Sequence, residues 1–300
     1  MKHLLSIEAL SGGEIAQIVA LAERMKAERG HHPVRPLTGQ CWGLVFSKSS
    51  TRTRVSFEVG IRELGGDVMF LSSNDIQLGR GEPIKDTARV MGRMLGGAVI
   101  RTFAQSDVEV FAEYSGIPTI NALTDDEHPC QILADLQTIK EKLGDYTGKK
   151  VCFIGDGACN VARSWIWAAA RCGFELVIAA PENYQPDAAL LSAVNSSNIS
   201  VTDNLIEAAA GADVLYTDVW VSMGKEEEAE FRLAQLAGYQ INTDTVAAAQ
   251  PGALVMHCLP AYREKEITDE IFEQHAQTIF DEAENRLHAQ KAVLWLLAEG

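Results

Sequence analysis

The segment 49–54 places hydroxyl and guanidinium groups where a helix is expected to begin. It reads Ser-Ser-Thr-Arg-Thr-Arg and follows an apolar run, 41–46, that predicts a buried strand. Hydroxyls at a helix start cap free backbone N–H groups, and these groups and the helix dipole also attract an anion. A capped helix with two solvated arginines is the alternative. However, arginines in a first turn oppose the dipole, whereas a guanidinium fork beside hydroxyls suits phosphate. We therefore interpret 49–54 as a phosphate-binding segment.

A second polar group, His128-Pro129-Cys130-Gln131, stands at another expected helix start. Pro129 suits the first helical position, which makes His128 the cap residue. Gln131 lies three residues after His128, so both side chains can face one point. A capped helix with an ordinary histidine explains these four residues equally well.

The turn 155–160, Gly-Asp-Gly-Ala-Cys-Asn, follows a third expected strand. It is similar to the start of a dinucleotide-binding motif but lacks the third glycine, and the next strand ends at 179–181 without an acidic partner for a ribose. We interpret it as a tight strand-to-helix turn that presents Asn160. An NAD-dependent dehydrogenase stays as the alternative chemistry.

Two more polar segments, 218–224 and 257–261, come at the ends of expected strands. The carboxylate of Asp218 can pair with an ammonium group, and 222–224 is typical of a loop at a site entrance. Cys258 stands in the other segment, but a lone buried cysteine is more often a core residue than a nucleophile. The sequence alone does not establish a histidine–cysteine pair for acyl transfer.

These segments must be positioned by elements that alternate along the chain. Parallel sheets covered by helices are predicted, giving an α/β fold of two doubly wound domains with helices on both faces. Ligands bind beyond the carboxyl ends of such strands, where the polar segments lie. The expected strands are 41–46, 68–71, 98–102, 118–121, 151–154, 176–180, 214–218 and 254–257. The expected helices are 51–64, 84–95, 108–115, 129–142, 161–171, 187–194 and 282–297.

Length and charge restrict the class of protein further. Three hundred residues suggest two domains of roughly 150 residues each, and the glycine-containing turn at 143–149 is the expected boundary. A net charge of −15 disfavours nucleic acid and anionic membranes as partners. Basic residues nevertheless gather in the first third of the chain, which suits a cleft for an anionic substrate.

The six cysteines bear on the cellular compartment and on metal binding, and the hydropathy pattern bears on membrane segments. No Cys-x-x-Cys pair or zinc-finger spacing occurs, so we expect reduced thiols, a cytoplasmic protein and no metal. No signal peptide and no 18-residue apolar window is evident, so we expect no membrane segment.

Taken together, the five segments resemble the aspartate/ornithine carbamoyltransferase family in order and spacing, from about residue 3 to residue 298. Family features are the phosphate segment 50–54, Arg101 and the 128–131 group. The segments 218–224 and 257–261 are similar to those of the ornithine branch. Two departures are Ser47, where a glutamate is common, and Cys159, where the first of two asparagines is common; Asn160 matches the second.

The resemblance implies transfer of the carbamoyl group of carbamoyl phosphate to the δ-amine of L-ornithine, giving L-citrulline and phosphate in arginine biosynthesis. It implies no cofactor and a homotrimer or a multiple of trimers. We expect a carbamoyl phosphate domain at 1–143, an ornithine domain at 144–281 and a helix at 282–300 that packs back on the first domain. Alternatives are another amine acceptor, such as putrescine or an acylated ornithine, and an inactive homologue that serves as a binding subunit.

The resemblance also implies the site residues. Arg101, His128 and Cys258 would be catalytic, with Thr53, Arg101 and His128 polarising the carbamoyl carbonyl and Gln77 reaching a neighbouring subunit. The residues expected to bind carbamoyl phosphate are Ser50, Thr51, Arg52, Thr53, Gln77, Arg101, His128, Gln131, Cys258, Leu259 and Arg286. The residues expected to bind ornithine are Asn160, Asp218, Ser222 and Met223.

Overall fold

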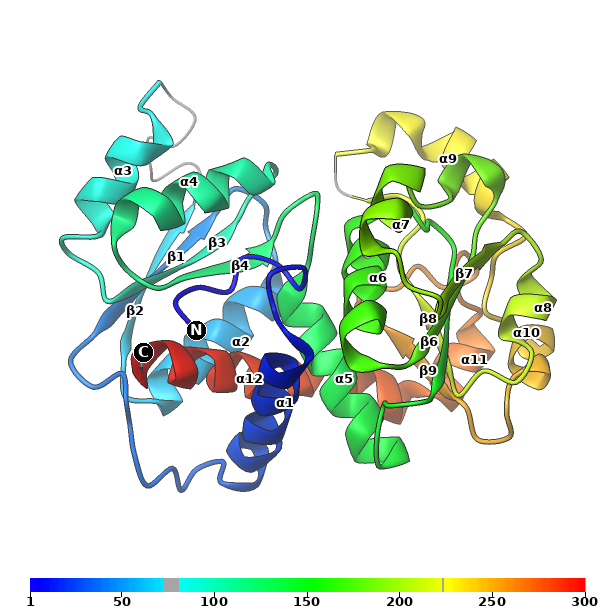
Figure 1. Cartoon of the computed structure of the whole chain (residues 1–300), viewed down its shortest axis with the longest axis horizontal. Helices are drawn as coiled ribbons and strands as arrows, with labels where there is room; N and C mark the ends of the chain where they lie inside the picture. The colour runs from blue at the N-terminus through cyan, green and yellow to red at the C-terminus, as the bar shows by residue number, and fades with distance from the viewer. Residues whose placement is uncertain (73–80, 223, 300) are drawn as a thin grey trace. The chain divides into compact units, whose positions relative to one another are not determined.

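The computed structural model describes residues 1–72, 81–222 and 224–299, so the expected site residues Gln77 and Met223 lie outside the described residues (Figure 1). The chain forms two compact units. Unit 1 comprises residues 1–137 and 284–300, and unit 2 comprises residues 138–283. The division falls within helices α5 (Pro129–Leu143) and α12 (Ala276–Glu299).

Unit 1 is built on a parallel sheet of four strands in the order β2-β1-β3-β4. Strand β2 lies on one side of β1, and β3 and β4 lie on the other. The strand order therefore reverses between β1 and β3, which is the switch point of the sheet. Phe46 and Arg101 are paired at this switch point, at the carboxyl ends of the two strands. The strands are β1 (Cys41–Phe46), β2 (Asp67–Ser72), β3 (Gly97–Arg101) and β4 (Thr119–Leu123).

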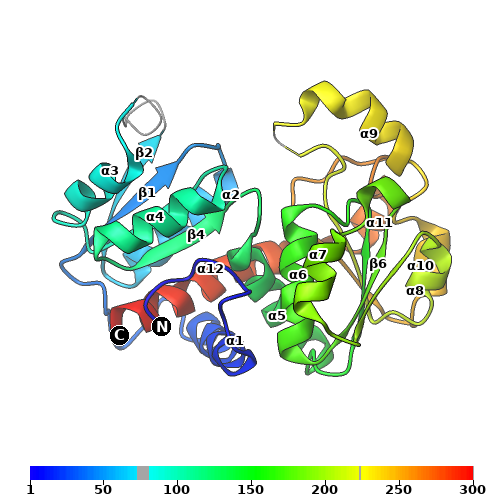
Figure 2. The same cartoon turned by 45° about the horizontal axis from the view of Figure 1, so that its top comes forward.

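Helices cover both faces of the unit 1 sheet. Helices α3 (Ile84–Met91) and α4 (Gln105–Ser115) lie on one face, and α1 (Gly12–Ala27), α2 (Thr51–Glu63) and α12 lie on the other (Figures 1 and 2). The side chains of Val45 in β1 and Ile100 in β3 point toward α3 and α4, where they pack with Ala88 and Phe111. This period-2 burial gives the sheet an apolar face for each layer of helices.

Unit 2 has five parallel strands in the order β7-β6-β5-β8-β9, with its switch point between β5 and β8. Cys152 and Ile154 point to one face, where they pack with α8 and α11, whereas Phe153 points to the other face and stacks on Tyr216. The strands are β5 (Lys150–Ile154), β6 (Glu175–Ala179), β7 (Ile199–Thr202), β8 (Val214–Thr217) and β9 (Leu254–His257).

Helices also lie on both faces of the unit 2 sheet (Figures 1 and 2). Helices α6 and α7 are on one face, and α8, α10 and α11 are on the other. The bounds of the helices are α6 (Asn160–Cys172), α7 (Ala188–Val194), α8 (Leu205–Ala209), α9 (Ala229–Leu236), α10 (Thr243–Ala248), α11 (Asp269–Gln274) and the 3₁₀ turns η1 (Glu182–Tyr184) and η2 (Glu226–Glu228).

The predicted α/β class with two parallel sheets is confirmed, as is the C-terminal helix that packs back on the first domain. Lys291 of α12 donates a hydrogen bond to Glu63 of α2 at 2.7 Å and to the carbonyl oxygen of Met25 in α1 at 3.3 Å. Helices α1, α8, α9, α10 and α11 and strand β7 were not predicted. Strand β7 is a partly exposed edge strand without a continuous apolar run, so its sequence carries a weak strand signal. No described helix is both long and apolar enough to cross a membrane.

Candidate active site in two parts

The start of α2 forms a cap at the carboxyl end of β1. Ser50 is the N-cap, and its Oγ accepts a hydrogen bond from the backbone N–H of Thr53 at 3.3 Å. The Ser50 hydroxyl also donates to Oγ1 of Thr53 at 3.0 Å. The first turn of α2 contains no acidic residue, so nothing in that turn competes with an external anion for the helix dipole.

A buried arginine of the last helix lies beside this cap. Nη1 of Arg286 donates to Oε1 of Gln131 at 2.6 Å, and Nη2 donates to Oγ1 of Thr53 at 3.3 Å. Arg286 is only 3% exposed, and Gln131 is held in turn by Asp135 at 2.8 Å. These two hydrogen-bond partners of the guanidinium are neutral groups, and a buried cation with neutral partners favours an anionic ligand.

Two more predicted residues of unit 1 belong to the same cluster. Arg101 ends β3 and His128 immediately precedes α5; both are buried. Burial lowers the pKa of His128 well below its usual value, and the charges of Arg286, Arg101 and Arg52 lower it further. The imidazole is therefore neutral at pH 7, able to donate one hydrogen bond and accept one.

The structure thus brings together three guanidinium groups, a neutral imidazole and a capped helix start at the carboxyl edge of the unit 1 sheet. Such preorganised donors hold a dianion and stabilise negative charge that develops on a nearby oxygen. The eight predicted residues in this cluster are Ser50, Thr51, Arg52, Thr53, Arg101, His128, Gln131 and Arg286.

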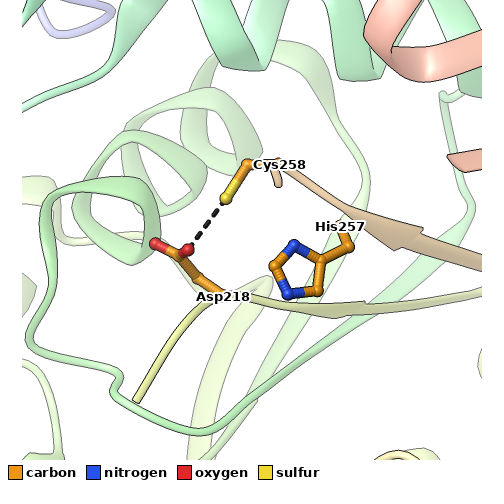
Figure 3. A group of neighbouring side chains, drawn as sticks. All are labelled: Asp218, His257 and Cys258. Atoms are coloured by element: carbon orange, nitrogen blue, oxygen red, sulfur yellow. Dashed lines mark hydrogen bonds between the residues drawn. The ribbon is translucent and has the colours of Figure 1, made fainter. Parts of the chain in front are cut away.

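A second polar cluster stands at the carboxyl ends of β8 and β9 in unit 2. The thiol of Cys258 donates to Oδ1 of Asp218 at 2.8 Å (Figure 3). The N–H of Val219 donates to the same oxygen at 2.7 Å. Burial raises the pKa of Asp218, whereas these hydrogen bonds act in the opposite direction. A half-buried carboxylate of this kind gains from pairing with a cationic amine.

His257 is next to Cys258, but its ring is already engaged. Nδ1 accepts from the N–H of Leu259 at 2.8 Å, and Nε2 lies 3.2 Å from Oε1 of Glu266. Since Nδ1 accepts a hydrogen bond, Nε2 carries the ring proton and donates a hydrogen bond to the carboxylate of Glu266. Asp218, His257 and Cys258 offer potential metal ligands within 4.8 Å of one another, but a metal there would require His257 to give up one of these bonds.

The loop after β5 lies against the loop after β8. Gly155 has a φ of 122°, and a Cβ at this position would lie 3.4 Å from Nε1 of Trp220. Cys159 caps α6, with its Sγ accepting from the N–H of Ala162 at 3.4 Å, and Asn160 is the first residue of that helix. Burial, followed by Asp218 and Asp156, raises the pKa of Cys159, which keeps it a neutral thiol.

The structure places the remaining predicted residues of unit 2 near these strand ends. Ser222 follows β8 in the chain and is half-buried, and Leu259 packs on the apolar core of unit 2. In unit 2, sequence reasoning missed two fully buried carboxylates, Glu266 and Glu282. Glu282 accepts from the N–H of His257 at 2.9 Å. Neither carboxylate has a local sequence signal, because its partners are brought to it by the fold.

The fold and the two clusters define an α/β enzyme with guanidinium groups around a buried histidine in one unit and a carboxylate–thiol pair in the other. The model of the carbamoyl phosphate-binding domain of aspartate/ornithine carbamoyltransferases matches residues 2–141. The model of the Asp/Orn-binding domain matches residues 147–297. The chain therefore belongs to the aspartate/ornithine carbamoyltransferase family.

Individual relatives agree with this assignment. The ornithine carbamoyltransferase of Akkermansia muciniphila is 59% identical over 100% of this chain and 99% of its own length. That of Syntrophotalea carbinolica is 50% identical over 98% of both chains. The crystal structure of the anabolic ornithine carbamoyltransferase of Campylobacter jejuni has a TM-score of 0.94 at 43% identity, covering 100% of this chain and 99% of that one.

Proposed function

We propose that the protein transfers the carbamoyl group of carbamoyl phosphate to the δ-amine of L-ornithine, giving L-citrulline and phosphate. The observation that carries this proposal is the convergence of three arginines on the neutral His128, beside the start of α2. The names of the relatives support ornithine as the acceptor.

In the proposed reaction, unit 1 binds and activates carbamoyl phosphate. The phosphate lies at the start of α2, where Ser50, Thr51, Arg52 and Thr53 present hydroxyls, backbone N–H groups and a guanidinium. The carbamoyl oxygen takes hydrogen bonds from Thr53, Arg101 and His128, which stabilise it as negative charge develops. Gln131, oriented by Arg286, holds the carbamoyl nitrogen.

Unit 2 binds the acceptor in this proposal. Asp218 pairs with the α-ammonium group of ornithine, and Asn160, Ser222 and Met223 hold the rest of its amino acid head. Cys258 and Leu259 border both the δ-amine and the carbamoyl group. Binding both substrates in one orientation replaces an encounter in solution, which contributes about 7 kcal/mol or more.

The chemical step balances without an added cofactor. The lone pair of the neutral δ-amine forms a C–N bond to the carbamoyl carbon, and the C–O bond to phosphate breaks. The leaving phosphate takes the proton that the amine loses.

We also propose that the protein is a cytoplasmic homotrimer or a multiple of trimers that serves arginine biosynthesis, with Gln77 reaching a neighbouring subunit. Light scattering of the purified protein tests this assembly.

The decisive experiment incubates the purified protein with carbamoyl phosphate and ornithine and measures citrulline. Putrescine and N-acetylornithine in place of ornithine test the other acceptors by their ureido products. A fluorescence titration with NADH tests the dehydrogenase alternative. We expect citrulline as the main product and no saturable NADH signal. Absence of any ureido product would refute the proposal and favour a binding subunit.

A further inference from the structure

Arg232 of α9 is a buried arginine in unit 2 that the reaction above does not use. Its side chain is 9% exposed. Nε donates to the carbonyl oxygen of Trp220 at 2.7 Å, and Nη2 forms an ion pair with the carboxylate of Asp156. The guanidinium carbon lies 4.9 Å from the centre of the Tyr184 ring.

Asp156 and Trp220, the two hydrogen-bonded partners of Arg232, belong to the two loops at the switch point of the unit 2 sheet. Asp156 is in the loop after β5, four residues before Asn160. Trp220 is in the loop after β8, midway between Asp218 and Ser222. One guanidinium therefore joins the two loops that carry the expected contacts to the amino acid head of the acceptor.

The contact of Arg232 with Asp156 and Trp220 is held tightly by its surroundings. Oδ1 of Asp156 also accepts the N–H of Ala158 at 3.0 Å, so the carboxylate is held on both sides. A Cβ at Gly157 would lie 2.7 Å from the side chain of Ile178 and 3.0 Å from the carbonyl oxygen of Tyr184, so the loop sits directly on β6 and η1. Any displacement of Asp156 or Trp220 thus moves the loops rather than a free side chain.

The burial of the ion pair separates it from ordinary surface pairs. Burial raises the pKa of Asp156, and Arg232 opposes this rise. Removing the guanidinium would leave a buried carboxylate without its cation, and the loop would have to open toward water to solvate it. An exposed pair would lose only a weak and solvent-screened contact.

We propose that Arg232 is a positioning residue for the acceptor amino acid. It sets the distance between the loop that presents Asn160 and the loop that presents Asp218 and Ser222, and it does not touch the substrate. This inference rests on the proposed function. Its specific consequence is a defect in acceptor binding with intact binding of carbamoyl phosphate, whose predicted contacts around Arg52 and His128 lie in unit 1.

The test compares Arg232→Gln, Arg232→Lys and Asp156→Asn with the unaltered protein. Arg171→Gln is the matched control, because Arg171 also lies over an aromatic ring, that of Trp167 at 5.6 Å, but in the exposed last turn of α6. Steady-state kinetics give KM for ornithine and kcat, calorimetry without ornithine gives Kd for carbamoyl phosphate, and thermal unfolding gives Tm.

We expect Arg232→Gln to raise KM for ornithine at least tenfold while Kd for carbamoyl phosphate stays within twofold. Arg232→Lys should recover part of this loss, because an ammonium can pair with Asp156 but cannot also reproduce the directed bond to Trp220. Asp156→Asn should show the same selective defect, and Arg171→Gln should behave like the unaltered protein.

An unchanged KM for ornithine in Arg232→Gln, or an equal loss for both substrates that follows the fall in Tm, would overturn the inference. If Arg232→Gln does not fold, Arg232→Lys supplies the same comparison. If the unaltered protein forms no citrulline, the proposed function itself fails, which is distinct from an active protein that is indifferent to Arg232→Gln.

Discussion

Arg286 and Gln131 are 155 residues apart in the chain, yet Nη1 of the arginine donates to Oε1 of the glutamine at 2.6 Å. The contact joins α12 to the start of α5, and the same guanidinium reaches Thr53 at the start of α2. Three helix segments of unit 1 are thereby held around one buried positive charge, which is the core of the proposed carbamoyl phosphate site.

Replacing this charge should separate binding from stability. In Arg286→Met we expect the free energy of carbamoyl phosphate binding to weaken by about 2–5 kcal/mol, the usual cost of losing a buried charged contact. We expect the free energy of unfolding to stay constant or rise, because the buried guanidinium has neutral partners and its desolvation is no longer needed. Calorimetric titration and urea unfolding measure the two quantities. An unchanged affinity would contradict the site.

Arg52 should matter through charge at the start of α2. Arg52→Ala should weaken carbamoyl phosphate binding by about 2–5 kcal/mol, seen as a rise in its Kd and KM. Arg62→Ala is the control on the same helix, because Arg62 has a side chain that is 56% exposed and pairs with Glu58 at 3.4 Å. If both variants bind carbamoyl phosphate like the unaltered protein, the role of Arg52 is wrong.

The low pKa of His128 predicts a pH effect on stability. As pH falls through 6.5, the unfolded chain takes up a proton on this histidine while the folded protein does not, so folding is progressively destabilised. Between pH 7 and pH 5.5 this one group accounts for about 1 kcal/mol. We expect His128→Asn to lose less stability over this interval than the unaltered protein. His31→Asn, at an exposed histidine, controls for the substitution; equal slopes for all three would exclude the effect.

Asp218 should act on the acceptor alone. Asp218→Asn keeps the shape of the side chain but removes the charge that pairs with an ammonium group. We therefore expect kcat/KM for ornithine to fall roughly 100-fold, which corresponds to about 3 kcal/mol of lost transition-state stabilisation. Kd for carbamoyl phosphate should not change. Asp187→Asn is the control, since Asp187 caps α7 and asparagine is an equally good cap. A defect confined to carbamoyl phosphate would reverse the assignment of Asp218.

Lys291 should be a stability residue of α12. Its Nζ is fully buried and contacts Glu63 at 2.7 Å and Nε2 of His32 at 2.9 Å. Burial lowers the pKa of Lys291, and Glu63 opposes this. Lys291→Ala should cost about 3–5 kcal/mol in the free energy of unfolding, because it breaks a buried pair and leaves a cavity. Arg29→Ala, which removes the more exposed partner of Glu63, should cost about 1 kcal/mol or less.

Local sequence signals determined the class of fold and the places where chemistry is expected. The alternation of apolar runs and helical patterns predicted the strands of both sheets apart from β7. Burial on both faces leaves a continuous apolar run in the central strands β1, β3, β5 and β8, and the edge strand β2 carries an apolar run although it is partly exposed. The starts of α2 and α5 follow the predicted pattern, with Ser50 as N-cap and Pro129 as the first helical residue. Such signals act within a few residues and can be read without tertiary structure.

Only the tertiary structure decided which distant groups meet. The contact of Arg286 with Gln131, the pair of His257 with Glu266 and the joint made by Arg232 all connect residues on different elements. Arg232 stands beside an acidic run that reads as a solvated helical face, and its burial follows from where α9 packs. A charged side chain has the same sequence signature in water as in a buried pair. Its partner is chosen by the packing of the whole unit, and that choice sets its function.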